Sequence, residues 1–288
     1  MRNALGPSLA VVIGGALWGV LWIPFRMMAE RGVDGAWGGF FTYVVMAVVL
    51  APLLWHRGGA WRGEWRMTVL GGLFTGTAFS LYAISLNHTE VVRVLLLFYV
   101  TPVWSTLIGV AFLGERATLS RIAALALGLG GLMVVFGVGA RFPLPENFGD
   151  WLALFSGFCW SVGSVFLFSA RVSRVLQQMS AFVAGALAVS AAAIWLGVAA
   201  APVAALGLAW PVVLLTAALA LPAIFLTLWP ANLLSPARLG VLLMSEVLVG
   251  VATAAWLAGE PFGPREMIGT ALIIAAGLVE VLGKPGKV

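Results

Sequence analysis

Charged side chains are scarce in this sequence. Asp, Glu, Lys and Arg make up 9% of its 288 residues, whereas soluble globular domains carry about 25%. Hydrophobic residues make up 62%, so the chain has too little polar surface to cover itself in water. This composition excludes an ordinary soluble domain and predicts an integral membrane protein.

Residues that form disulfides or bind metals are also few. The single cysteine, Cys159, falls inside an apolar run and excludes an intramolecular disulfide. Only His56 and His88 accompany it, so we expect no metal site and no cofactor. The net charge of +5 does not indicate nucleic acid, because the sixteen basic residues are dispersed singly between apolar blocks. We expect them to face anionic lipid instead.

Long apolar runs are abundant. A membrane helix needs about 17–25 mostly apolar residues, and the sequence predicts ten of them with short connections. The first could be mistaken for a signal peptide, but it is longer than the apolar h-region of a typical signal peptide and lacks a clear small-x-small cleavage site. The expected fold class is therefore an all-α polytopic membrane protein. Its predicted spans are Ser8–Met28, Ala36–Trp55, Met67–Leu86, Val91–Phe112, Arg121–Val138, Asp150–Phe168, Ser180–Ala200, Pro211–Trp229, Pro236–Ala258 and Glu266–Gly283.

The rare polar residues recur in register. Three pairs are each separated by 145 positions: Asn87 and Asn232, Arg93 and Arg238, and Gly114-Glu115 and Gly259-Glu260. Because charged and amide residues are scarce, their agreement in phase is informative. Trp18-Gly19 likewise matches Trp160-Ser161 at a separation of 142. We predict two five-helix repeats, residues 1–140 and 141–288, that form one transport domain.

The basic residues predict the orientation. With the N-terminus inside, eleven of the sixteen lie in inside segments, and five lie outside: Arg26, Arg31, Arg93, Arg141 and Arg265. This bias favours both termini in the cytoplasm. Since five spans is an odd number, the second repeat enters the membrane from the opposite side and is inverted. Inverted repeats supply two nearly equivalent conformations, which predicts a secondary transporter working by alternating access.

The order of short motifs resembles the EamA-type members of the drug/metabolite transporter superfamily. These motifs are Trp18-Gly19, Tyr82-Ala83, Asn87, Tyr99-Val100-Thr101-Pro102 and Gly114-Glu115, with a degenerate second copy. The resemblance covers nearly the whole chain and implies a ten-helix carrier of the bacterial inner membrane, with a central cavity lined by helices one, three, four, six, eight and nine. Within the superfamily the chain is similar to aromatic amino-acid exporters of the YddG type, although Thr101 stands where related exporters often carry Trp.

Aromatic residues in the middle of spans are candidates for substrate binding. Trp18 lies midway along the first span, Trp22 follows one turn later, and Trp160 occupies the matching position in the sixth span. Tryptophans usually form interfacial belts, so these positions indicate either binding or helix packing. The hydroxyl groups of Tyr82 and Tyr99 need partners and should face the interior. A neighbouring backbone carbonyl is the alternative partner.

Glu246 is the one ionisable residue near the middle of a predicted span. A buried carboxylate is costly, so Glu246 should be neutralised, paired or facing a wet cavity. It is predicted to contact a substrate ammonium group or to couple transport to protons; a hydrogen bond to helix four at Thr101 is the alternative. Ser245 beside it is predicted as a polar contact or as helix–helix glue.

Helix ends carry the remaining structural expectations. Prolines are predicted to interrupt or end spans as hinges or kinks, at Pro24, Pro102, Pro222 and Pro230. Arg93 and Arg238 each lie near a helix start and are expected to contact a lipid phosphate or a loop acid, with gating as the less favoured role. Runs of small residues at 128–131 and 275–277 predict close packing of the fifth and tenth spans.

The residues predicted to line the transport path also indicate which class of substrate is carried. No Lys or Arg occupies the middle of a span, which disfavours phosphorylated cargo. Aromatic side chains and one acid suit an amino acid or metabolite with an ammonium group, aromatic amino acids above all. Lipophilic cationic drugs are the alternative. An enzyme is not expected, because it would need a nucleophile–base pair or metal ligands inside the spans. The expected partners are a small-molecule substrate and the lipid bilayer, with the protein as a monomer.

Overall fold

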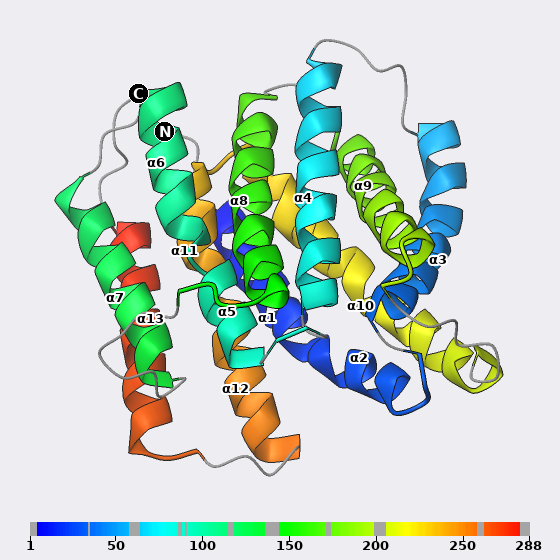
Figure 1. The fold of residues 1–288 in the computed structure, drawn as a ribbon. Helices are drawn as coiled ribbons and strands as arrows, with labels where there is room; N and C mark the ends of the chain where they lie inside the picture. Colours follow the sequence, from blue (N-terminus) through cyan, green and yellow to red (C-terminus); the bar gives the residue numbers. More distant parts are fainter. Residues whose placement is uncertain are drawn as a thin grey trace.

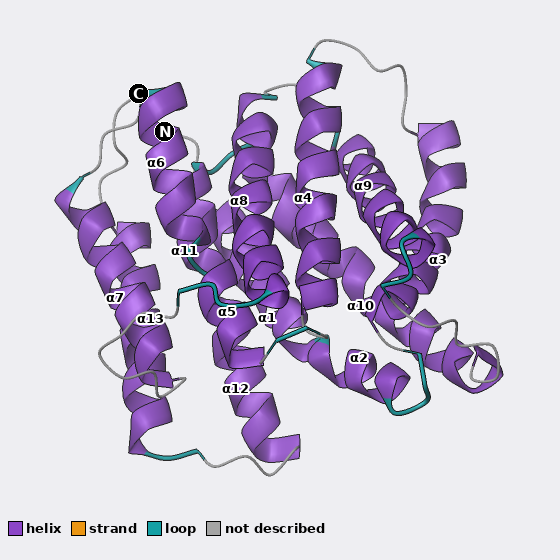
Figure 2. Ribbon diagram, in the orientation of Figure 1, coloured by secondary structure: helices purple, strands orange, loops and turns teal. Residues whose placement is uncertain are grey.

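The computed structural model describes residues 5–33, 35–57, 64–85, 88–89, 91–114, 118–135, 144–170, 174–198, 206–257 and 262–282. All regular structure in these ranges is helical (Figures 1 and 2). The helices are α1 (Leu5–Val20), α2 (Trp22–Ala29), α3 (Gly35–Arg57), α4 (Trp65–Ser85), α5 (Val91–Phe98), α6 (Thr101–Leu113), α7 (Leu119–Val135), α8 (Phe148–Ser169), α9 (Val175–Trp195), α10 (Leu206–Ala231), α11 (Pro236–Leu243), α12 (Ser245–Leu257) and α13 (Pro264–Leu282).

Eight helical segments of the described chain are long and apolar enough to cross a membrane. They are Leu5–Ala29, Gly35–His56, Trp65–Ser85, Arg93–Leu113, Phe148–Ser169, Val175–Trp195, Gly207–Ala231 and Pro236–Leu257. Helix α7 is apolar but has only 17 residues, and α13 carries the charged residues Arg265, Glu266 and Glu280. The chain is thus a multi-pass membrane protein, and the number of ten crossings stays a prediction.

The predicted seventh span is displaced in the structure. It was expected at Ser180–Ala200, but α9 covers Val175–Trp195 and so begins five residues earlier. Gln177 and Gln178 lie in the first turn of this helix, and both side chains are buried. At the other end, Gly197 has φ 73°, a left-handed conformation that ends helices.

Three of the predicted spans are each broken into two helices. The breaks fall at Leu21 between α1 and α2, at Tyr99 and Val100 between α5 and α6, and at Met244 between α11 and α12. Prolines explain the first two, because Pro24 and Pro102 have no N–H to donate to the carbonyl four residues earlier. The Phe98 carbonyl, which Pro102 cannot reach, accepts a hydrogen bond from the Thr101 hydroxyl instead, at 2.5 Å.

The prolines of α10 behave differently from the expectation. Helix α10 continues through Pro222 without the predicted interruption, and Pro230 lies one residue before its end. A proline's fixed φ is compatible with a helix and removes only one hydrogen bond, so neighbouring contacts can hold the helix together. The span is therefore not interrupted at Pro222, and a kink at Pro222 or Pro230 stays a prediction.

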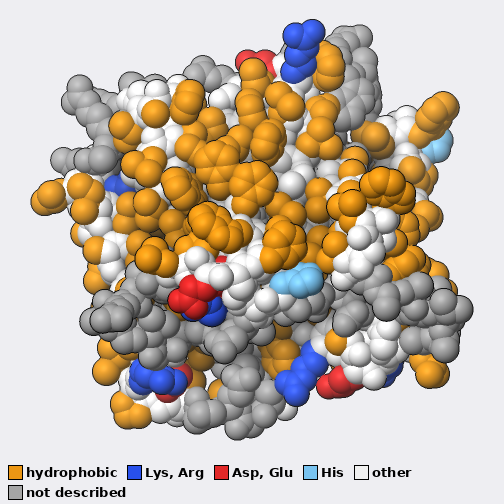
Figure 3. All heavy atoms as spheres, viewed as in Figure 1, with side chains coloured by type: hydrophobic (Ala, Val, Ile, Leu, Met, Phe, Trp, Pro, Cys, Tyr) orange, Lys and Arg blue, Asp and Glu red, His pale blue; other side chains and the backbone are white. Residues whose placement is uncertain are grey.

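The helices pack around α4, which lies between α8 and α9 in the middle of Figure 1. Helix α1 packs on α10 and α12, α3 packs on α9, and α7 packs on α13 at the edge of the molecule. Gly131 and Gly269 lie in the contact between α7 and α13. Of these two, only Gly131 belongs to a predicted run of small residues. Gly130 and Gly277 also belong to those runs, but neither faces a neighbouring helix. Hydrophobic side chains cover a broad area of the surface seen in Figure 3, and charged groups are sparse on it.

Candidate functional site

Aromatic rings from four helices meet around Phe79 of α4. Trp18 of α1 stacks on Phe79, with ring centroids 4.1 Å apart. Trp160 of α8 meets the same ring edge-on at 5.3 Å, and Phe98 of α5 lies at 6.3 Å. We call Trp18, Phe79, Tyr82, Phe98, Tyr99 and Trp160 the aromatic cluster. It brings together side chains from both halves of the sequence.

The two tyrosines complete this cluster through Phe98. The centroid of the Tyr82 ring lies 5.1 Å from that of Phe98, and the centroid of the Tyr99 ring, the next residue in the chain, lies 5.3 Å from it. Tyr99 and Trp160 are each 1% exposed, whereas Trp18 and Tyr82 are half-buried. The cluster is therefore fully packed at Tyr99 and Trp160 and partly exposed at Trp18 and Tyr82.

Glu246 joins the aromatic cluster through Tyr99. The Tyr99 hydroxyl donates a hydrogen bond of 2.6 Å to Oε2 of Glu246 and lies 3.4 Å from the carbonyl oxygen of Leu243. That carbonyl precedes the helix break at Met244, where Val247 N–H bonds Met244 instead. The expected hydrogen bond between Glu246 and the fourth predicted span (α5 and α6) is present, but its donor is Tyr99 and not Thr101. A side chain at one helix break thus contacts a carboxyl group beside another.

Trp22 and Ser245 are not part of the aromatic cluster. They form hydrogen bonds between α12 and the first span. The indole N–H of Trp22 donates to Thr253 Oγ1 at 3.0 Å. The Ser245 hydroxyl donates to the carbonyl of Val12 at 3.0 Å. Trp18 makes a comparable contact with α10, where its indole N–H donates to Thr227 Oγ1 at 3.2 Å. All three tryptophan or serine contacts are polar links between helices inside an apolar interior.

Sequence reasoning missed Phe79, Phe98 and Thr227. The chain contains 17 phenylalanines, so no single one stands out by its rarity. Helical spacing offers a usable signal, because Phe79 precedes Tyr82 by three residues and so lies on the same face of α4. Phe98 is adjacent to Tyr99 at the break that Pro102 produces. Thr227 gives no comparable signal, because threonines also bond their own helix backbone, as Thr227 does to Ala223.

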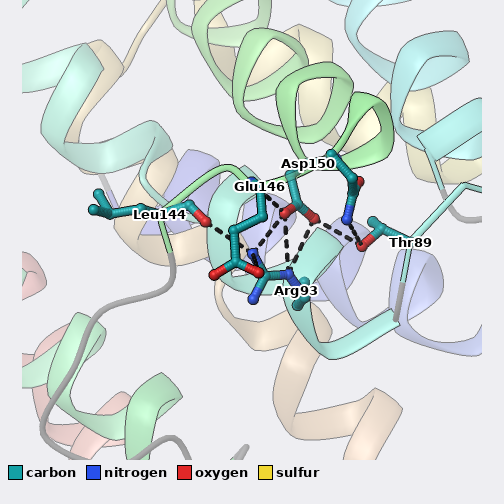
Figure 4. Close-up of polar contacts among 6 residues, drawn as sticks. Thr89, Arg93, Leu144, Glu146 and Asp150 are labelled. Atoms are coloured by element: carbon teal, nitrogen blue, oxygen red, sulfur yellow. Dashed lines mark hydrogen bonds and ion pairs between the residues drawn. The ribbon is translucent and has the colours of Figure 1, made fainter.

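A second set of polar contacts joins α5 and α8 near the start of each helix (Figure 4). Arg93 of α5 binds Asp150 of α8 through two nitrogens, with Nη2 at 2.6 Å from Oδ2 and Nε at 3.2 Å from Oδ1. Thr89 donates to Oδ1 of Asp150 at 2.7 Å. Arg93 also donates to the carbonyl of Leu144 at 2.8 Å. The expected loop acid is present, because Arg93 Nη2 lies 3.6 Å from the Glu146 carboxylate in the loop before α8. The shorter contact is with Asp150, in the first turn of α8.

The aromatic cluster combines apolar ring surfaces with one carboxyl group, that of Glu246. Aromatic contacts contribute about 0.5–1.5 kcal/mol each, which suits a ligand that must be released. No group of three or more His, Cys, Asp or Glu side chains that could hold a metal ion lies within the described ranges. The chemistry available at this site is thus recognition by aromatic faces, one carboxyl group and a few hydroxyls.

Comparison with known proteins finds a similarity to one family in the first half of the chain. Residues 6–137 match the EamA-like transporter family. An uncharacterized transporter of Vibrio cholerae is 26% identical over 148 residues, which is 47% of this chain and 48% of that protein. The uncharacterized transporter YwfM of Bacillus subtilis is 30% identical over 98 residues, or 33% of each chain. The alignments thus span half or less of these relatives.

A solved crystal structure shares the fold over almost the whole chain. It superposes with a TM-score of 0.73 and covers 98% of this chain and 99% of its own, at 21% sequence identity. The family match covers residues 6–137, and the structural likeness concerns the fold of nearly the whole chain.

Proposed function

We propose that the protein is a secondary transporter that exports amino acids, aromatic ones above all, or related metabolites across the bacterial inner membrane, with both termini in the cytoplasm. The observation that carries the proposal is the position of the aromatic cluster and Glu246 between the two halves of the chain. Ring faces complement an aromatic or apolar side chain, and the carboxyl group of Glu246 complements an α-ammonium group. The half-buried margin of the cluster, at Trp18 and Tyr82, gives such a ligand a place to enter.

The helix breaks support a mechanism with two inverted repeats. The break at Tyr99 and the break at Met244 are separated by 145 residues, the same register as Arg93 and Arg238. The residue pairs Phe98 and Leu243, and Thr101 and Glu246, follow the same register. Broken helices that meet near the middle of a bundle are typical of substrate sites in repeat-built transporters.

Contacts across the halves support the same mechanism. A Cβ at Gly157 of α8 would lie 2.6 Å from the carbonyl oxygen of Phe98. A Cβ at Gly15 of α1, 142 positions earlier, would lie 3.2 Å from the carbonyl oxygen of Leu243. In each half, a glycine of the first span therefore packs closely against the helix break of the other half. Gly15 of α1 packs at the α11–α12 break, and Gly157 of α8 packs at the α5–α6 break. Two equivalent seams of this kind are what an alternating-access transporter requires, because opening one can accompany closing the other.

Substrate binding is proposed to compete with the contact between Tyr99 and Glu246. The hydroxyl of Tyr99 donates to the carboxyl group, and an ammonium group supplies a stronger donor of the same kind. Since Tyr99 belongs to the first half and Glu246 to the second, exchange of one donor for the other changes a contact between the halves. Binding energy can thereby act on the equilibrium between conformations.

Reconstitution into liposomes tests the proposal. Proteoliposomes are loaded with labelled tryptophan, phenylalanine, threonine or a lipophilic cation, with and without a proton gradient. We expect tryptophan and phenylalanine to cross at rates at least about tenfold above empty liposomes and above threonine, because two or more ring contacts of the stated size distinguish them. Flux of the lipophilic cation alone would favour drug efflux, the alternative function. Flux of none of the four would contradict both.

Phe79→Leu is expected to change specificity within this assay. Leucine keeps an apolar side chain in α4 but removes the ring that Trp18, Trp160 and Phe98 contact. We expect flux of tryptophan to fall about tenfold and flux of threonine to fall less than about threefold, since only an aromatic cargo gains from the ring surfaces that Phe79 orders. Equal losses for both cargoes would show that Phe79 has only a packing role.

A further inference from the structure

Two hydrogen bonds between a tryptophan and a threonine join the first span to helices of the second half. Trp18 of α1 donates its indole N–H to Thr227 of α10 at 3.2 Å, and Trp22 of α2 donates to Thr253 of α12 at 3.0 Å. The two bonds are alike in chemistry and in length. They differ in one respect, because only Trp18 belongs to the aromatic cluster. The molecule therefore contains its own comparison between a tethered ring inside the cluster and one outside it.

The hydroxyl group of Thr227 has its proton directed away from Trp18. It donates to the carbonyl oxygen of Ala223 at 2.7 Å, and a hydroxyl has only one proton but two lone pairs. The oxygen is thus oriented to accept from the indole. Gly14 lies one turn before Trp18 on the same face of α1, and a Cβ there would lie 3.0 Å from Thr227 Oγ1. The absence of a side chain at Gly14 allows Thr227, which is 1% exposed, to approach α1 this closely.

This hydrogen bond determines how the indole of Trp18 lies on Phe79. The two rings stack with centroids 4.1 Å apart and planes inclined by 21°. Stacking does not distinguish two orientations of the indole that differ by a half-turn about its bond to Cβ, because both present a flat face to Phe79. Only one of the two directs the N–H at Thr227. Since a buried N–H without an acceptor costs free energy, the hydrogen bond selects that orientation.

We propose that Thr227 is a positioning residue for substrate selectivity, because it holds Trp18 in one orientation on Phe79 and so gives an aromatic cargo a fixed ring to contact. The proposal rests on the aromatic cargo given under the proposed function. Thr227 acts through Trp18, which is the partly exposed member of the pair. The indole N–H and the Thr227 proton are both used within the protein. Trp18 therefore recognises its cargo through the ring alone, by stacking or by a cation–π contact.

The first test compares Thr227→Val and Thr227→Ser in the proteoliposome assay. Valine has nearly the shape of threonine but no acceptor, whereas serine keeps the hydroxyl. We expect Thr227→Val to lower tryptophan flux about fivefold, mainly through a higher KM, and threonine flux less than about twofold, because only an aromatic cargo uses the ring. Thr227→Ser should keep tryptophan flux within about twofold of the wild type. Thr227→Ala, which also lacks the hydroxyl, replaces the valine variant if that protein does not fold.

Thr253→Val is the matched control. The hydroxyl of Thr253 donates to its own helix backbone at Val249 and accepts from Trp22, as Thr227 does from Trp18. The substitution thus removes the same kind of acceptor from a tryptophan that lies outside the aromatic cluster. We expect the ratio of tryptophan flux to threonine flux in Thr253→Val to stay within about twofold of the wild type.

The second test observes the ring of Trp18 without any substrate. Protein labelled with fluorotryptophan is studied by fluorine NMR, and the signal of Trp18 is assigned by its absence in Trp18→Phe. In Thr227→Val this signal should shift and either broaden or split in two, because both orientations of the indole become populated. In Thr227→Ser and Thr253→Val it should stay single and close to its wild-type position.

The two tests separate positioning from cargo. A single, unshifted Trp18 signal in Thr227→Val would overturn the positioning role. A changed signal with an unchanged ratio of tryptophan to threonine flux would overturn the role in selectivity, as would an equal fall of that ratio in Thr253→Val. If the wild-type protein carries no tryptophan, the proposed cargo is rejected, and the fluorine signal still decides whether Thr227 fixes the ring of Trp18.

Discussion

Glu246→Gln is expected to reduce flux of aromatic amino acids at least about 100-fold while leaving the protein folded. Glutamine has nearly the same shape and can still accept a hydrogen bond from Tyr99, but it cannot balance the charge of a substrate ammonium group. Truncating one partner of a buried charge pair costs about 2–5 kcal/mol, and a factor of 100 corresponds to about 2.7 kcal/mol. The measurement is initial flux in proteoliposomes at equal protein content, with thermal unfolding as the test of folding.

Tyr99 variants separate the charge of Glu246 from its position. Tyr99→Phe removes only the hydroxyl that donates to Glu246 at 2.6 Å, and a lost hydrogen bond to a buried partner costs about 1–3 kcal/mol. We therefore expect about a tenfold loss of flux, and abolished flux in Tyr99→Ala, which also removes the ring against Phe98. Glu30→Gln is the matched control, since Glu30 is exposed and forms an ion pair with Arg26, four residues earlier in the chain. Normal flux in both Glu246→Gln and Tyr99→Ala would dismiss this site.

The sequence predicted helix positions and the rare residues well, for a physical reason. Apolar runs of the length of a membrane helix leave little choice of where helices lie, so the predicted spans agree with helices in the structure apart from α9 and α10. Each of these two begins five residues before its predicted start. Glu246 and Tyr99 could be singled out because an ionisable or hydroxyl group in the middle of an apolar span needs a partner. The identity of that partner could not be predicted, because it depends on how two distant helix breaks face each other.

The break at Met244 shows a second limit of sequence reasoning. Two of the breaks could be predicted from Pro24 and Pro102, which lack the backbone N–H group. No proline lies within a turn or two of the break at Met244. The sequence indicates this break only through the 145-residue repeat, in which Met244 corresponds to Tyr99. Pro222 shows the converse, because a proline is present and the helix continues. Whether a helix breaks is thus decided by which neighbours satisfy the free carbonyl groups, and those neighbours come from the other half of the chain.

Helix α4 carries the tightest backbone contact found here, although the sequence drew attention to small residues in other helices. A Cβ at Gly76 would lie 1.9 Å from the carbonyl oxygen of Phe182 in α9, and one at Gly72 would lie 2.4 Å from the Cβ of Ala181. These two glycines are four residues apart and so share one face of α4, where they allow the backbones of α4 and α9 to touch. The aromatic cluster depends on this contact, because α4 holds Phe79 and Tyr82 in place.

Gly76→Ala is therefore expected to lower the free energy of unfolding by about 3 kcal/mol or more, because the clash is with backbone and no side-chain rotation can relieve it. The measurement is the thermal unfolding midpoint in detergent, together with the yield of monodisperse protein. Gly130→Ala in α7 is the matched control: no atom lies within 4 Å of its added Cβ, and alanine's higher helix propensity should leave stability unchanged or raise it by up to about 1 kcal/mol. Equal midpoints for the two variants would mean that α4 and α9 can separate without cost, and the rigid placement of Phe79 and Tyr82 would then need another explanation.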